Sequence, residues 1–512
     1  MIPTDRRRAR RAVLLLSTTA SAAALAAGCA GTPSVGGAPG ASPAPNVAWT
    51  PSERVVRGQR LAEARAVDDA GRAASRDSAR FRPGAPDFGA RLARLTLADV
   101  VDLGLRNNTA TRIAWANAQA AASAYGAERG TWLPTIDADV TGSRVKTAAS
   151  AGRVAVEQWV FNPSVGLSYL LFDFGGRTGR VASARESMIA ASFSHNAAIQ
   201  DVVLQIQVAY FSYVANRGLL EAQRASLREA QTNLEAAEER RRVGLATIAD
   251  VLQARTAASR VALDAQTTEG ALQTARGALA LALGLPANLP YDVDSAAATT
   301  PVAPLADSVD AIIGAAVRAR PDLAAARAEA EAARARIGVA RAARLPSLSL
   351  SGNAGRTYTT TIPDGANSYQ LQLGLSIPLF SGFSRAYDQR AAAWQAEASA
   401  ARAEQVRQVV VFDVFRAYYE LQTATRRVGT ADDLLASAQQ STEVALARYR
   451  EGVGSVLDLL SAQSALAEAR AERVQAQLAW SVALAQLAHD AGILDTRGGS
   501  PLRLTTDTTT PR

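Results

Sequence analysis

The sequence has 512 residues, of which 48% are hydrophobic but only 5% are aromatic, and alanine supplies much of the apolar share. Alanine is the strongest helix former, so the composition favours long packed helices over one large globular core. The net charge of +8 comes from arginines interspersed with acidic residues, which is typical of solvated helix faces and not of a nucleic-acid surface. With two histidines and one cysteine, a His/Cys metal site, a cysteine nucleophile and a cofactor are not expected.

Residues 1–28 show the pattern of a bacterial export signal. A run of arginines precedes an apolar stretch that is too short to span a membrane. The segment Leu25–Cys29 resembles a lipoprotein cleavage site, in which the cysteine is lipidated, although Ala26 stands where leucine is usual. The resemblance implies a lipid anchor on Cys29 in the outer membrane. The alternative is an ordinary signal peptide with an incidental cysteine.

Residues 29–94 are predicted to be a lipidated N-terminal tether and linker, because 31–51 are rich in Gly, Pro, Ser and Ala. A unit over 95–290 follows. It opens with a helix over roughly 97–131, which ends before Pro134 because the residue preceding proline disfavours the α region. Strands are expected over about 135–172, with a loop near 143–157.

A very long helix is predicted next, over about 178–240, where no proline interrupts the sequence. Val202, Ile206, Ala209 and Tyr213 form an amphipathic stripe along it. Roughly 60 residues at ~1.5 Å each give about 90 Å, which suits a helix that crosses a compartment. A glycine-containing turn at 243–246 then leads into a return helix that ends near 283.

The same elements recur over 307–493, after a linker at 291–306 and before a flexible tail at 494–512. Gly244 matches Gly452 at an offset of 208 residues, and many other pairs keep this offset. The second copy predicts a helix over 307–343, strands over about 347–380 with a loop near 356–367, a long helix over 386–448, and a return helix that ends near 491. The chain is therefore a duplication of one helix–hairpin–helix unit.

The predicted strands alternate strictly between apolar and polar or small residues. In the second copy the apolar positions are Tyr369, Leu371, Leu373, Leu375, Ile377 and Leu379. This period of two fits a half-buried sheet of a water-soluble protein. It equally fits a barrel strand with one face toward lipid and the other toward a wet lumen.

Two segments, 242–252 and 448–460, sit in register within the duplication and resemble the turn regions of the TolC-like outer membrane efflux proteins. The resemblance covers about 95–492, and the N-terminus points to the lipoprotein (NodT-type) branch. It implies a mainly α fold with a small β part. It also implies a trimer with an α-helical barrel in the periplasm and a twelve-stranded transmembrane β-barrel, four strands per protomer. Four strands cannot close a barrel alone, and open edges cannot face lipid.

The resemblance also implies partners and site residues. The turns would dock a periplasmic adaptor (membrane fusion) protein that couples the channel to an inner-membrane pump. The docking residues it implies are Val243, Gly244, Leu245, Val453, Gly454 and Ser455. The periplasmic gate it implies consists of Asp250 paired with Tyr449, and of Asp458 repeated around the axis. The sequence departs from the family at Gly454 and Ser461, where an arginine and an aspartate are usual. The alternative for both aspartates is a charge at a helix N-terminus.

The leading interpretation is an outer membrane channel subunit of a tripartite efflux system, which passively conducts small molecules and contacts outer membrane lipid but no nucleic acid. The outer-membrane exit of a type I protein secretion system shares the fold, although lipidation argues against it. A periplasmic coiled-coil scaffold lipoprotein does not need alternating strands or paired glycine turns. An enzyme is not expected, because no catalytic constellation or phosphate loop is present.

Overall fold

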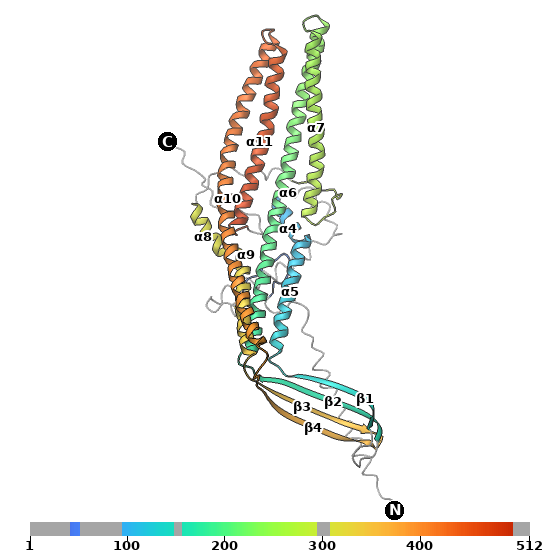
Figure 1. Ribbon diagram of the computed structural model, residues 1–512. Coiled ribbons are helices and arrows are strands. Elements are labelled where there is room, and N and C mark those ends of the chain that lie inside the picture. Colours follow the sequence, from blue (N-terminus) through green and yellow to red (C-terminus); the bar gives the residue numbers. More distant parts are fainter. Residues whose placement is uncertain (1–40, 52–94, 148–155, 294–307, 495–512) are drawn as a thin grey trace, which may run out of the picture.

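The computed structural model describes residues 41–51, 95–147, 156–293 and 308–494. The predicted signal peptide, Cys29, most of the linker up to 94, the first hairpin loop, 294–307 and the tail from 495 lie outside the described residues. The described chain is mainly helical with one small antiparallel sheet at the end of the helical part (Figure 1). The predicted fold class is confirmed at this level.

The two repeats contain the same elements in the same order. The first contains α4 (Leu97–Asn107), α5 (Thr109–Gly130), β1 (Thr135–Thr147), β2 (Val156–Phe172), α6 (Gly176–Arg242) and α7 (Ile248–Ala282). The second contains α8 (Val309–Ala319), α9 (Pro321–Ala342), β3 (Ser347–Thr359), β4 (Ile362–Ser376), α10 (Ser384–Arg450) and α11 (Val456–Asp490). Corresponding helices have equal lengths of 11, 22, 67 and 35 residues. The repeats differ in strand length instead, since β2 has 17 residues and β4 has 15.

The opening helix of each repeat is two helices, so the expectation of one helix over 97–131 and one over 307–343 is wrong. Asn108 takes extended dihedrals between α4 and α5, and its side chain accepts a hydrogen bond from the Ala110 amide at 2.8 Å. Asparagine is a favoured N-cap residue. In the second repeat Arg320 takes the same conformation because Pro321 follows it.

The sheet has the order β1-β2-β3-β4, and all neighbouring strands are antiparallel. The strands run further into the hairpins than expected: β3 reaches Thr359 and β4 begins at Ile362, which leaves a two-residue connection. At its other end β4 stops at Ser376, short of the expected 380. Pro378 lacks the amide that a ladder needs, so Ile377 and Leu379 lie beyond the strand.

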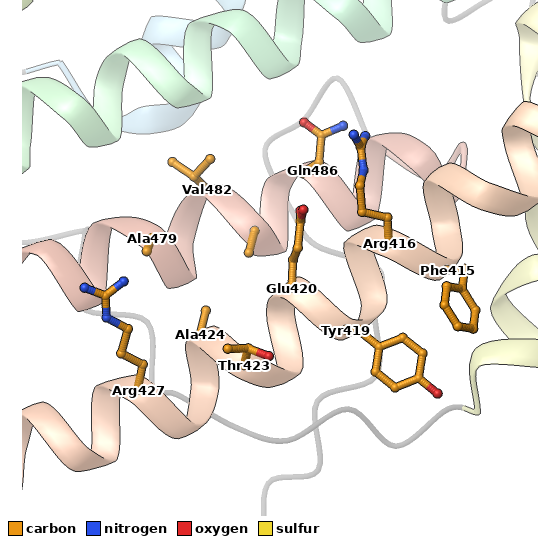
Figure 2. A pocket seen from close by; sticks show the side chains of 11 residues that line it. Phe415, Arg416, Tyr419, Glu420, Thr423, Ala424, Arg427, Ala479, Val482 and Gln486 are labelled. Atoms are coloured by element: carbon orange, nitrogen blue, oxygen red, sulfur yellow. The ribbon is translucent and has the colours of Figure 1, made fainter.

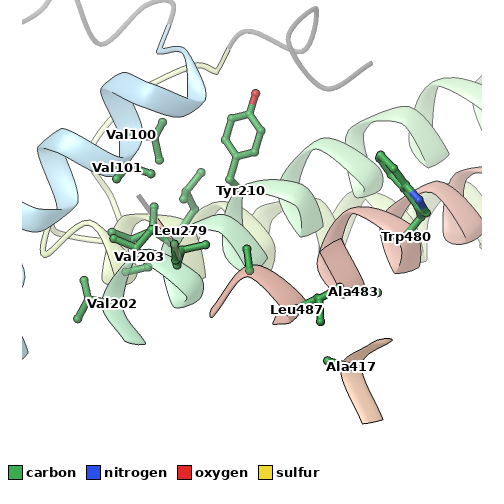
Figure 3. Packing of buried hydrophobic residues seen from close by; sticks show 14 of the residues in the cluster. Val100, Val101, Val202, Val203, Tyr210, Leu279, Ala417, Trp480, Ala483 and Leu487 are labelled. Atoms are coloured by element: carbon green, nitrogen blue, oxygen red, sulfur yellow. The ribbon is translucent and has the colours of Figure 1, made fainter. Parts of the chain in front are cut away.

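The long helices pack through alanine, valine and leucine side chains, with Tyr210 and Trp480 among them (Figure 3). Of the stripe expected on α6, Val202, Ile206 and Tyr213 are buried and Ala209 is partly buried. The corresponding stripe of α10 is buried throughout, at Val410, Val414, Ala417 and Leu421. Each fully buried large aliphatic side chain contributes about 1.5–3 kcal/mol, so the stripe stabilises the packing of the long helices in this region.

The described helices of one protomer form a layer with two edges. α6 packs against α5, α7, α9 and α11, whereas α10 packs against α8, α9 and α11. α5 and α7 therefore lie toward one edge and α10 lies at the other (Figure 1). The sheet continues the same arrangement, because α5 leads into the edge strand β1 and the edge strand β4 leads into α10.

The last part of the segment expected to be a flexible tether is docked on the helices. Trp49 is 5% exposed and packs edge-on against Phe193 of α6, with ring centroids 5.0 Å apart. Ser42 is also buried. A composition rich in Gly, Pro and Ala predicts a free chain, but a single tryptophan provides enough apolar surface to fix it.

Candidate functional site

The two turns at the far end of the long helices have the same helix-ending geometry. In the first turn the Gly244 amide donates to the Arg241 carbonyl at 3.0 Å, and the Leu245 amide donates to the Arg240 carbonyl at 2.7 Å. This is a Schellman motif, which needs a left-handed residue, and Gly244 has φ +80°. Gly452, with φ +74°, has this role in the second turn.

Gly454 is needed for a different reason. Its amide donates to the Arg448 carbonyl at 3.0 Å. A Cβ placed on Gly454 would lie 3.0 Å from the Cβ of Arg448 and 3.2 Å from the Tyr449 amide nitrogen. A side chain at this position therefore requires the turn to shift, which gives a local reason why no arginine stands there.

The six residues expected at the docking tip surround these turns. Val243, Leu245 and Val453 are 62%, 71% and 68% exposed, respectively. These apolar side chains at a helix tip are thus largely uncovered by the described part of the protomer. Ser455 instead is the N-cap of α11, so its hydroxyl has a helix-starting role whatever it contacts outside.

Each of the two candidate gate aspartates belongs to a capping box at the start of a return helix. The Asp250 carboxylate accepts from the Thr247 amide at 2.8 Å and from its hydroxyl at 2.9 Å, and the Asp250 amide donates back to that hydroxyl. Asp458 has the same reciprocal arrangement with Ser455. Each carboxylate thus stabilises a helix start and still presents a negative charge at the tip.

Tyr449 is held by Arg240, a residue that the sequence reasoning missed. The Arg240 Nη1 donates to the Tyr449 carbonyl at 2.9 Å, and its guanidinium lies 4.6 Å from the centre of the Tyr449 ring. The contact joins α6 of the first repeat to α10 of the second. Within one protomer Asp250 contacts Thr247 and Tyr449 contacts Arg240, so the pairing of Asp250 with Tyr449 stays a prediction. Arg240 is one of three consecutive arginines, and nothing in that run distinguishes it.

The strand register places the apolar positions of the predicted alternation on one face of the sheet. Ile136 pairs with Leu167, Leu167 with Gly352, and Gly352 with Leu371. One position further along, a row of Asp137, Gly166, Asn353 and Gln370 crosses the opposite face. The apolar face is exposed in the protomer, as at Ile136, Val140, Val165, Tyr369, Leu371, Leu373 and Leu375. A sheet with one apolar and one polar face suits the wall of a membrane channel, with lipid on one side and water on the other.

Exposed aromatic side chains flank the apolar face at both ends. Trp159 and Phe161 lie toward the hairpin end. At the helical end two T-shaped pairs occur, Phe172 with Phe174 and Phe380 with Phe383, with centroids 4.7 and 5.6 Å apart. Aromatic girdles of this kind mark the two interfaces of a membrane barrel.

A buried charged cluster lies where α6, α9, α10 and α11 meet, and the sequence reasoning missed it. Arg320 is 3.4 Å from Asp413, 3.8 Å from Asp490 and 2.7 Å from Asp322. His489 contacts Asp490 and Asp201, each at 2.9 Å. Burial lowers the pKa of His489, but hydrogen bonds to the two carboxylates outweigh it and raise the pKa to about 9. The partners are up to 288 residues apart in the chain, so no local pattern reveals them.

An open groove of about 990 Å³ lies between α10 and α11 (Figure 2). Its wall on α10 includes Phe415 and Tyr419, and its wall on α11 includes Val482. The groove lies at the free edge of the helical layer. Within the described residues, no three His, Cys, Asp or Glu side chains are grouped as metal ligands, and no helix has an apolar stretch sufficient to cross a membrane.

The sequence profile of outer membrane efflux proteins matches residues 100–285 and 312–492. The chain belongs to the outer membrane efflux protein family. The match includes both turn regions and the whole sheet, so the resemblance seen in the sequence is confirmed. The profile leaves the lipoprotein branch open.

Several relatives of this efflux protein are known. Protein CyaE of Bordetella pertussis is 29% identical over 390 residues, which cover 75% of this chain and 81% of CyaE. Outer membrane protein OprJ of Pseudomonas aeruginosa is 26% identical over 376 residues, 71% of this chain and 77% of OprJ. The probable efflux pump outer membrane protein TtgC of Pseudomonas putida is 25% identical over 388 residues, 73% and 78% of the two chains.

Solved structures share the fold of this efflux protein. The outer membrane protein VceC of Vibrio cholerae superposes with a TM-score of 0.68 at 20% identity, over 77% of this chain and 96% of VceC. CusC, described as forming a transmembrane channel, also superposes with a TM-score of 0.68, at 23% identity over 77% of this chain and 92% of CusC.

Proposed function

We propose that this protein is the outer membrane channel subunit of a tripartite efflux system, a passive duct for small molecules delivered by an inner-membrane pump through a periplasmic adaptor. The observation that carries the proposal is the sheet, which has one apolar face, one polar face and two unpaired edges, and which is joined directly to helices of 67 residues. Relatives named as efflux pump outer membrane proteins support the efflux role.

The channel is a trimer in this proposal. Strands β1 and β4 have unpaired edges that lipid cannot satisfy, so copies must join edge to edge. Two copies would give eight strands, whose interior is filled by side chains. Three copies give twelve strands and are the smallest assembly that leaves a duct.

The edges of the helical layer support the same contact between neighbouring copies, here called the seam. α10 exposes large apolar side chains along its free edge, namely Tyr387, Trp394, Phe412, Phe415 and Tyr419. On the opposite edge α5 exposes Ile113 and α7 exposes Leu263. Burying these surfaces against the next protomer removes a large apolar area from water. The α10/α11 groove lies on this seam.

The finer assignments of the proposal are three. Cys29 carries the lipid anchor. The exposed tip side chains Val243, Leu245 and Val453, with Gly244, Gly454 and Ser455 shaping the turns, dock the adaptor. Asp250, Tyr449 and Asp458 line the periplasmic gate, where Asp458 is repeated three times around the axis and attracts cations.

A deletion strain tests the function. The strain should retain fluorescent dyes and become susceptible to small toxic compounds, and the wild-type gene on a plasmid should restore efflux. A C29S variant, with intact-mass analysis of the purified protein, tests lipidation separately. Unchanged dye efflux together with failure to release a secreted protein would overturn the efflux proposal in favour of a secretion exit.

A further inference from the structure

The face of α5 and α6 that holds the N-terminal segment combines polar and apolar side chains in a pattern that matches this segment, which turns between Ala44 and Val47. Asn196 of α6 forms a two-way hydrogen bond with the backbone of Trp49: its Oδ1 accepts from the amide at 2.6 Å and its Nδ2 donates to the carbonyl at 2.7 Å. Trp115 and Gln119 of α5 both donate to the Ser42 carbonyl, at 2.9 and 2.8 Å. Side chains that form hydrogen bonds with the backbone of a segment at two points are characteristic of peptide recognition.

Between these two points lies a fully buried histidine. The Nε2 of His195 is 3.0 Å from the Pro45 carbonyl, which can only accept, so Nε2 carries the proton. The Nδ1 is buried without a partner among the described residues, and burial lowers the pKa of His195. The imidazole is therefore neutral and forms its one hydrogen bond with the segment. Burying its other nitrogen without a partner is destabilising and rare, which indicates a specific role.

The duplication provides an internal control for this face. At the offsets between the repeats, Trp115 corresponds to Arg327, Phe193 to Ala401, His195 to Ala403 and Asn196 to Glu404. Glu404 is exposed and forms an ion pair with Arg407. The same helices in the second repeat therefore present a solvated charged face, and the peptide-holding side chains occur only in the first.

We propose that this face is a peptide-binding groove whose ligand is the chain's own segment 42–49, and that it fixes the leash of the lipid anchor to the wall of the same protomer. Ala328 of α9 belongs to the same buried cluster as Trp49. The docked segment thus joins α5 and α6 of the first repeat to α9 of the second.

The direction of the segment fits an anchor in the membrane. Gln119 lies 11 residues from the sheet end of α5 at Gly130, about 17 Å along the helix. Asn196 lies 20 residues from the sheet end of α6 at Gly176, about 30 Å. The chain from Ser42 to Trp49 therefore runs away from the sheet, with its N-terminal end nearer the membrane.

The length of the leash fits as well, and this step rests on the proposed lipidation. Cys29 precedes Ser42 by 13 residues, which reach at most about 45 Å when extended. The dock of Ser42 is about 17–23 Å from the sheet along α5. A lipidated Cys29 reaches the inner surface of the membrane beside its own protomer and little further.

Chymotryptic cleavage after Trp49 in the full-length, detergent-solubilised protein tests the groove. Cleavage at this bond requires the tryptophan to leave its site. An Asn196→Ala variant should speed the appearance of the new N-terminus at Thr50 by roughly tenfold or more, because it removes a buried two-way hydrogen bond. Glu404→Ala, at the corresponding position of the second repeat, is the matched control and should leave the rate unchanged.

A binding measurement provides the second arm. A labelled synthetic peptide of residues 41–51 should bind a Trp49→Ala full-length chain, whose own segment no longer fills the site, and should bind wild type at least tenfold more weakly. The proposal would be overturned if Asn196→Ala were cleaved at the wild-type rate, or if Glu404→Ala accelerated cleavage as much as Asn196→Ala does. It would also be overturned if the peptide did not bind to the Trp49→Ala chain. An unlipidated Cys29 in the intact mass of the mature wild-type chain would refute the anchor and leave the groove intact.

Discussion

The two repeats agree in the lengths of their helices and differ at the joint, the place where the break in the opening helices meets the end of the return helix. In the first repeat the joint is neutral: the Asn108 side chain donates to the Ala282 carbonyl at 3.0 Å. At the corresponding places in the second repeat stand Arg320 and Asp490, and His489 corresponds to Leu281. One copy closes its joint with an amide and the other with a buried ionic cluster.

The comparison shows which features of the unit are fixed by its task. Helix lengths are set by distances that both copies must cover, so they are equal. The joint and the outer face of each copy are not shared with the other copy, so they diverge. The first repeat binds the N-terminal segment, and the second repeat has the buried charged cluster at its joint. Buried charges are costly unless paired, which makes the second joint the more sensitive of the two.

The largest expected effect is at this joint. Arg320→Ala removes the arginine that Asp322, Asp413 and Asp490 share, although His489 still contacts Asp490, and should lower the free energy of unfolding by about 3 kcal/mol. The matched variant Asn108→Ala removes the buried hydrogen bond to Ala282 and the N-cap of α5, and should cost about 1–2 kcal/mol. Guanidinium unfolding followed by circular dichroism compares the two. Equal losses would contradict the contrast between the joints.

The next effect is a loss of stability at alkaline pH that depends on His489 of the second repeat. His489 has a pKa raised to about 9, so its stabilising contribution is complete below about pH 6.5 and is lost as the pH rises through 9. The charged groups facing it are Asp201, Asp490, Arg320 and Asp413.

His489→Leu introduces the residue of the first repeat and should flatten the thermal stability profile between pH 6.5 and 9. The span is at most about 3 kcal/mol, and less because Asp201 is exposed and screened. A variant profile parallel to wild type would assign the pH dependence to another group.

A smaller effect is expected at the tip. Arg240→Ala removes the contact between the first-repeat helix α6 and Tyr449 of the second repeat. The loss of a partly buried cation–π contact and a hydrogen bond is about 1 kcal/mol, enough to increase the open fraction of a closed tip several-fold. Single-channel recordings in planar bilayers measure it, with the neighbouring Arg241→Ala as control. Identical open fractions would remove Arg240 from the gate.

The smallest effect distinguishes the two capping aspartates. Asp458→Asn keeps a side chain able to cap the helix but removes a charge that the proposed channel repeats around its axis. The preference for cations over anions should fall modestly, and Asp250→Asn should change it less. Reversal potentials in a salt gradient report this preference. An unchanged value in Asp458→Asn would mean that the residue is only a helix cap.

Much of the fold could be predicted because its signals are local and occur twice. The absence of proline gave the long helices, alternation gave the strands, and Gly244 and Gly452 gave the turns. The breaks at Asn108 and Arg320 were missed because the helical composition continues on both sides. The His489 cluster, the Arg240 contact and the docking of Trp49 involve partners distant in the chain, which one sequence without structure cannot pair.

The account depends most on the claim that one protomer forms a third of a closed outer membrane duct. Native mass spectrometry of the protein extracted from outer membranes tests this directly. The account predicts a single species with three times the mass of the mature chain. A stable monomer recovered from the soluble fraction would contradict it, because the exposed apolar face and both edges of the sheet would then lie in water.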